Sequence, residues 1–117
     1  MRKLSSHFMM QLKLGILQSI LHRVQNDDTL FLSIRNNYVS IYYRGGSILK
    51  LKESSSDKYQ AYFDRKYLKG NSYLQNKVQH IPDIIQSSTD AELWVNAFAY
   101  LKEGMDLWLR DHRKSER

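Results

Sequence analysis

Residues of the kinds that most often carry chemistry are few and scattered in this chain. It has no cysteine, which excludes a disulfide, a thiolate zinc site and a cysteine nucleophile. No histidine stands with another histidine or a carboxylate at a spacing typical of metal ligands. The glycine-rich nucleotide loops and the GxSxG elbow of serine hydrolases are also missing. We therefore expect no catalytic site, no metal and no cofactor. We expect His7, His22, His80 and His112 to be scattered surface or interfacial residues.

One short pattern does fit part of a known metal site. Asp64-Arg65-Lys66 matches the (D/E)xK half of a metal-dependent nuclease motif. In that motif two carboxylates bind a divalent metal, and the lysine helps to position or activate the attacking water. The motif needs an earlier acidic partner, usually on the preceding strand. Only Glu53 and Asp57 are available in that place, next to a serine-rich loop. The pattern is also short enough to arise by chance, so a small nuclease is the weakest hypothesis for function.

The basic residues are concentrated in the middle of the chain. The net charge is +6, and residues 35–69 hold eight basic and three acidic side chains. A local excess of positive charge can attract a polyanion, whereas an even spread would not. This stretch is therefore where we look for a binding surface.

Strand alternation turns that excess into one predicted surface. It places Tyr42 and Arg44 on the same side of a sheet as Lys50 and Lys52. Cations can pair with phosphates, and exposed tyrosine rings can stack on bases. The alternative is an ordinary solvated face, because Lys, Arg and Tyr are common there. The predicted surface for DNA or RNA consists of Arg35, Tyr42, Arg44, Lys50, Lys52, Lys58, Arg65 and Lys66.

Hydrophobic spacing predicts the elements that hold this surface. A helix is expected from Ser5 or Ser6 to about Val24, where apolar residues recur every three to four positions. After this helix, apolar residues recur at every second position. Asn36-Asn37 and Gly45-Gly46 suit tight hairpin turns. We expect a four-stranded antiparallel meander with strands at 30–34, 38–44, 47–52 and 59–65.

After the strands the pattern becomes helical again. Residues 68–80 have no clear period and predict a loop, and Pro82 suits the first turn of a short helix through Ile85. Thr89-Asp90-Ala91-Glu92 matches a capping box, which predicts a long helix to about Arg113. The predicted fold is α+β, with the N-terminal helix and the long C-terminal helix packed on one face of the sheet.

A chain of 117 residues fits one domain, so we expect residues 1–117 to form a single unit. The last helix has no stop signal, which indicates the N-terminal module of a longer protein or, alternatively, a frayed tail. Leu107 and Leu109 lie partly off its apolar stripe and could contact a second copy or another domain. No apolar run is long enough for a membrane helix, so we expect a cytoplasmic protein without a membrane partner.

Three segments resemble a known family. FLSIRNNYVSIYYRGGSILKL, followed by YQAYFDRKYL, is similar to the N-terminal region of mostly uncharacterised bacterial proteins related to PD-(D/E)XK nucleases. LWLRDHRKSER resembles the helix that leads into their C-terminal nuclease-like domain. The resemblance covers residues 28–117 and implies that the metal-binding residues lie in that later domain. No matching position has a known catalytic role, so no site residue carries over.

The sequence thus leaves three hypotheses for function. The first is a non-catalytic accessory module of a bacterial nuclease-like protein, which binds nucleic acid through the basic sheet face or positions the catalytic domain. The second is a module for protein interaction or homodimerisation through the last helix, with no nucleic-acid role. The third is the metal-dependent nuclease at Asp64 and Lys66.

Overall fold

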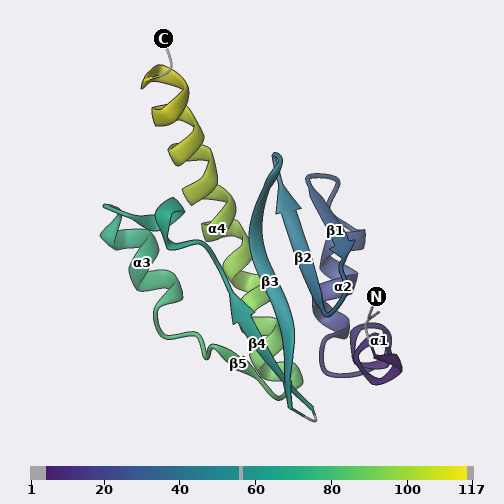
Figure 1. Ribbon diagram of the computed structural model, residues 1–117. Coiled ribbons are helices and arrows are strands. Elements are labelled where there is room, and N and C mark those ends of the chain that lie inside the picture. Colours follow the sequence, from purple (N-terminus) through teal and green to yellow (C-terminus); the bar gives the residue numbers. More distant parts are fainter. Residues whose placement is uncertain (1–4, 56, 116–117) are drawn as a thin grey trace.

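The strands of the described chain form an antiparallel sheet, and helices gather against one face of it (Figure 1). This arrangement is an α+β fold, which confirms the predicted class. The structure is a computed structural model that describes residues 5–55 and 57–115. Its elements are α1 (Ser6–Lys13), α2 (Gln18–Gln25), β1 (Leu30–Ile34), β2 (Tyr38–Tyr43), β3 (Gly46–Ser55), β4 (Lys58–Tyr62), the 3-10 helix η1 (Arg65–Leu68), α3 (Ser72–Val78), β5 (Ile84–Ile85) and α4 (Ser88–Ser115).

In the described residues the sheet has five strands in the order β1-β2-β3-β4-β5, each antiparallel to its neighbour. The predicted meander is confirmed, but the prediction of four strands is wrong. The fifth strand replaces the short helix expected from Pro82, since Ile84 pairs with Gln60 and Ile85 with Tyr59. A two-residue strand is too short to show a period, and it forms because β4 offers unpaired backbone groups along its edge.

The single N-terminal helix predicted up to Val24 is two helices, α1 and α2, which meet at a break around Gly15. The side-chain oxygen of Gln11 accepts a hydrogen bond from the backbone N–H of Ile16 at 2.9 Å. This bond satisfies a backbone donor that the interrupted helix leaves open. A Cβ on Gly15 would overlap the Gln11 side chain, so glycine makes the break possible. Leu14 is 79% exposed there, so not every apolar residue of the predicted helix is buried.

The segment 68–80, predicted to be a loop, contains the helix α3. The side chain of Asn71 caps it by accepting from the backbone N–H of Leu74 at 3.0 Å. Leu74 and Val78 are buried on one side of the helix. Two buried residues four apart are too short a pattern to predict a helix. The fourth strand also ends earlier than predicted, because Asp64 caps η1 and redirects the chain.

The second hairpin turn lies one residue earlier than predicted. Arg44 and Gly45 occupy it, with φ of 53° and 84°, and β3 already begins at Gly46. Positive φ at both turn residues matches the twist of a two-residue hairpin. Gly46 lies against other elements, since a Cβ there would be 2.9 Å from the hydroxyl oxygen of Tyr67. This close packing explains why a glycine stands at the start of β3.

The face of the sheet toward the helices forms the core, as predicted. Val39, Ile41, Leu49 and Leu51 are fully buried. Burying a side chain of this size stabilises the fold by about 1.5–3 kcal/mol. The helices contribute Phe8, Leu12, Ile20, Val24, Trp94, Phe98, Leu101 and Met105 to the same core.

The predicted long C-terminal helix is confirmed, but its cap lies elsewhere. α4 begins at Ser88, and the hydroxyl of Ser87 accepts from the backbone N–H of Asp90 at 3.2 Å. The carboxylate of Asp90 accepts in turn from the backbone N–H of Gln86 at 3.1 Å. These two hydrogen bonds cap the helix as a capping box would. They begin at Ser87, two residues before Thr89, where the capping box was predicted. Neither α4 nor any other helix in the described residues is long and apolar enough to cross a membrane.

Candidate nucleic-acid interface

The face of the sheet turned away from the core carries the outward side chains of the strands, and we call it the open face. The helices α2 and α4 contact the strands from the other side (Figure 1). Large side chains remain accessible on the open face: Phe31 is 66% exposed and Tyr62 is 50% exposed. Its outward strand positions include no Asp or Glu, because Glu53 pairs with the inward Tyr59. The open face is therefore a surface of aromatic, cationic and hydroxyl groups.

Aromatic rings of the open face come from the strands β1, β2 and β4. Strand register places Phe31 of β1 directly opposite Tyr42 of β2. Their ring centroids are 6.5 Å apart and the rings are tilted by 45°. Tyr38 lies four positions before Tyr42 on the same strand, and Tyr62 projects from β4. Rings spaced in this way offer successive surfaces on which unpaired bases can stack.

The cations of the open face stand between these rings. Lys50 lies opposite Tyr62 on β4, and Lys52 lies opposite Tyr38 on β2. The ammonium nitrogen of Lys50 is 5.4 Å from the centroid of the Tyr38 ring. Neither lysine forms an ion pair with any described residue. Both charges are thus available to a ligand, and Lys50 is already held beside a ring.

Arg35 extends the row of cations to the end of β1. Its guanidinium donates to the hydroxyl oxygen of Tyr42 at 3.5 Å. This hydrogen bond lowers the pKa of Tyr42 and raises the pKa of Arg35. The contact holds an exposed guanidinium across the outward side of the sheet, so the prediction that Arg35 and Tyr42 share one face is supported by the geometry.

Arg44 was predicted to lie on this face, and that prediction is wrong. The residue sits in the hairpin turn, and its guanidinium is 2.8 Å from a carboxylate oxygen of Asp106 on α4. The hydroxyl of Tyr43 donates to the same carboxylate at 2.9 Å. Burial and the neighbouring Asp106 raise the pKa of Tyr43, and the hydrogen bond to Asp106 raises the pKa of Arg44. Arg44 therefore ties the turn to the helix side of the sheet.

The last three predicted cations divide between two places. Lys58 is an exposed outward residue at the start of β4 and belongs to the open face. Arg65 and Lys66 lie in η1, beyond the end of that strand. The guanidinium carbon of Arg65 is 5.5 Å from the Phe63 ring, and the ammonium of Lys66 is 3.5 Å from Asp64. The structure thus groups Lys58 with the sheet and the other two with a neighbouring surface.

The nuclease-like pattern at Asp64 has a local structural explanation. Its carboxylate accepts from the backbone N–H of Lys66 at 3.0 Å and so caps η1. In the described residues no group of three or more His, Asp or Glu side chains is placed to hold a metal ion. Asp64 is therefore accounted for as a helix cap.

The predicted contact surface of the last helix is partly used within the chain itself. Leu107 and Leu109 are half-buried and pack against the core. Only the exposed parts of these two side chains can contact a partner, so the apolar surface for docking is smaller than the sequence pattern indicates. Homodimerisation through this helix stays a prediction.

No known protein family matches this chain. No curated protein and no solved structure matches it either. The resemblance to nuclease-like proteins therefore stays a prediction, and the open face is the feature from which a function can be inferred.

The sequence interpretation missed Phe31 and Tyr38 as members of this face. The information was present in part, because a turn at Asn36-Asn37 fixes the register of the two strands that it joins. That register places Phe31 opposite Tyr42. The exposure of these rings depends on which face the helices cover, and no local pattern reports this.

Proposed function

We propose that this chain binds single-stranded nucleic acid on the open face of its sheet. The observation that carries the proposal is the alternation of Phe31, Tyr42 and Tyr62 with lysines that form no ion pair within the described part of the chain. Backbone phosphates would pair with the lysines, and unpaired bases would stack on the rings. A duplex hides the faces of its bases, so it could use only the charges. Single strands are therefore the preferred ligand.

A role beside a nuclease-like catalytic domain belongs to the same proposal, but it rests on the sequence resemblance. In that role the chain holds the strand, and another domain carries out any cleavage. The second candidate, protein interaction without nucleic acid, has the half-buried leucines of α4 as its basis. The open face offers more accessible surface with a defined ligand chemistry, which favours nucleic acid.

The test is fluorescence anisotropy with labelled single-stranded and duplex oligonucleotides at about 50 and 200 mM salt. We expect micromolar or tighter binding of the single strand at the lower salt. Affinity should fall by about tenfold or more at the higher salt, because several phosphate contacts release counterions. No binding of the single strand at low salt would overturn the proposal.

A charge-reversal pair locates the binding surface. Lys50→Glu with Lys52→Glu should weaken binding by at least about tenfold and reduce the salt dependence. Lys13→Glu with Lys77→Glu is the matched control, because these lysines belong to α1 and α3 and the change in net charge is the same. Equal losses in both double variants would mean that total charge, and not this face, binds the strand. Arg44→Glu is unsuitable, since it would set two carboxylates together at Asp106.

A further inference from the structure

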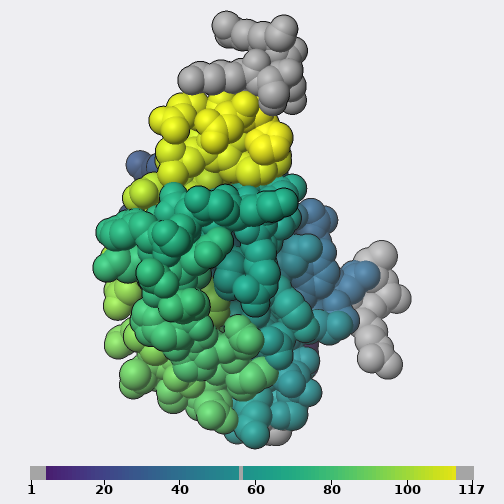
Figure 2. Space-filling model, turned by 90° about the vertical axis from the view of Figure 1, so that its left-hand side faces the viewer, coloured from purple at the N-terminus to yellow at the C-terminus, as the bar shows by residue number. Residues whose placement is uncertain are grey.

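A cleft lies beside the open face, between η1 and the last turns of α4. Figure 2 shows the end of α4 rising above the segment that contains η1 and α3. The cleft has a volume of about 570 Å³. η1 sits directly on α4 at Gly104, where a Cβ would be 2.7 Å from the carbonyl oxygen of Tyr67. This close packing fixes the position of η1 and therefore the shape of the cleft.

One side of the cleft is an aromatic stack. The rings of Tyr67 and Trp108 meet edge to face with centroids 5.3 Å apart. The imidazole of His112 stacks on Trp108 at 3.9 Å with an angle of 24° between the rings. Lys66 places its ammonium 4.9 Å from the Trp108 ring centroid. All three rings line the cleft, and flat rings of this kind are surfaces on which a nucleobase can stack.

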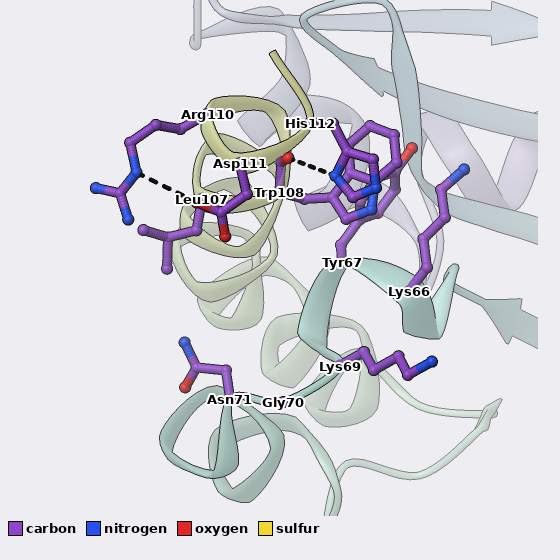
Figure 3. Close-up of a pocket in the computed structure, with 10 residues that line it drawn as sticks. All are labelled: Lys66, Tyr67, Lys69, Gly70, Asn71, Leu107, Trp108, Arg110, Asp111 and His112. Atoms are coloured by element: carbon purple, nitrogen blue, oxygen red, sulfur yellow. Dashed lines mark hydrogen bonds and ion pairs between the residues drawn. The ribbon is translucent and has the colours of Figure 1, made fainter. Parts of the chain in front are cut away.

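Cations stand on both sides of the same cleft. Figure 3 shows Lys69 with Gly70 and Asn71 along one side, and Arg110 with the aromatic stack along the other. Lys69 forms no ion pair with any described residue. Arg110 lies 3.8 Å from Asp111, which also lines the cleft. The lining still has an excess of positive charge, since Lys66 adds a third cation.

Tyr67 connects this cleft to the open face. It lines the cleft, and it also lines a smaller hollow of about 310 Å³ together with Lys50 and Tyr62. Those two residues belong to the open face. One ring is therefore shared by the surface proposed to bind the strand and by the cleft at the end of α4.

We infer that a nucleic-acid strand bound on the open face continues over Tyr67 into this cleft. A base stacks on the aromatic rings that line the cleft, and the adjoining phosphates lie between Lys69 and Arg110. This inference rests on the proposed function and adds a second segment to the binding site. The open face alone serves short strands, and the cleft is filled only by longer ones.

A series of oligothymidylates of about 4, 8, 12 and 16 nucleotides tests this division. With the native chain, affinity should rise with length until the strand reaches both surfaces. Lys69→Glu with Arg110→Glu should leave the shortest strand unaffected relative to the Lys13→Glu, Lys77→Glu control. The same variant should lose at least about tenfold in affinity at 12 and 16 nucleotides.

Tryptophan fluorescence reports the position of the strand directly. The chain has two tryptophans, and Trp94 is fully buried, so a strand in the cleft should quench Trp108. Long strands should quench the emission and the shortest strand should not. Trp108→Phe should abolish this quenching.

The two levels of the proposal fail in different ways. If Lys69→Glu with Arg110→Glu matches the control at every length while Lys50→Glu with Lys52→Glu weakens all strands, the cleft inference is overturned and the open face remains. If the native chain binds no strand of any length, the proposed function falls and the cleft inference falls with it.

Discussion

The two faces of this sheet are built from the same strands, but they differ in how far their aromatic side chains are shielded from water. Toward the helices, β4 buries Tyr59 completely against Phe8, with ring centroids 4.8 Å apart. Three residues later the same strand leaves Tyr62 half exposed on the open face. Phe31 is also exposed there, although a solvated face needs no such ring. Exposed rings set among cations are the composition expected of a binding surface.

The comparison predicts that each face can be damaged without damaging the other. Trp94 is fully buried, and its indole N–H donates to the carbonyl of Pro82 at 2.9 Å. Trp94→Ala should lower the free energy of unfolding by about 3–5 kcal/mol, because it leaves a large cavity. Urea denaturation followed by circular dichroism measures this loss. A decrease below about 1 kcal/mol would contradict the assignment of Trp94 to the core.

Phe31→Ala makes the opposite change on the open face. Binding of a single strand should weaken by about 1–3 kcal/mol, since one stacking surface is lost. The free energy of unfolding should change by less than about 0.5 kcal/mol. Anisotropy and urea denaturation on the same sample separate the two effects. A variant that unfolds more easily but binds as before would reverse the roles of the faces.

The buried tyrosine of β4, Tyr59, should make the stability of the fold sensitive to alkaline pH. Burial, with the nearby charges of Glu53 and Asp57, raises the pKa of Tyr59 to about 12, whereas an unfolded tyrosine has a pKa of about 10. The stabilising contribution of neutral Tyr59 is therefore complete below about pH 10 and is lost as the pH rises to about 12. After allowance for screening by water, the loss is about 1–2 kcal/mol.

Stability measured from pH 9 to 11.5 tests this behaviour against a matched variant. Tyr59→Phe removes the titrating group and a hydroxyl that has no hydrogen-bond partner among the described residues. It should be at least as stable as the native chain at pH 7. The difference between the two proteins should widen above pH 10. A constant difference across that range would show that Tyr59 titrates like an exposed tyrosine.

The smallest effect is expected from the hydroxyl of Tyr42. Tyr42→Phe keeps the ring and removes only the 3.5 Å contact with Arg35, so binding should change by less than about 0.5 kcal/mol. Tyr42→Ala removes the ring and should cost about 1–3 kcal/mol of binding. If both variants lost the same affinity, hydrogen bonding and not stacking would dominate on the open face.

Much of the sheet could be predicted because its determinants are local. Alternation from Leu30 to Ile34 and the turn at Asn36-Asn37 fix the first hairpin within a few residues. The inward set of Val39, Ile41 and Leu49 follows from the same period. The outward lysines Lys50, Lys52 and Lys58 follow too, since strand alternation leaves them no other face.

Other features were decided by groups far apart in the chain. Arg44 does not lie on the open face, because the turn is shifted by one residue. Its guanidinium donates a hydrogen bond to Asp106, 62 positions later in the chain. The pairing of β5 with β4 likewise joins segments that no period connects.

The sequence by itself determined which side chains share a face within the strands, because alternation is a property of the extended backbone. Only the tertiary structure decided which face the helices cover, and so which rings stay in water. It also decided that Tyr67 joins the open face to the cleft at the end of α4. The physical reason is that burial and clefts arise from packing between distant elements, which Gly104 permits where η1 meets α4.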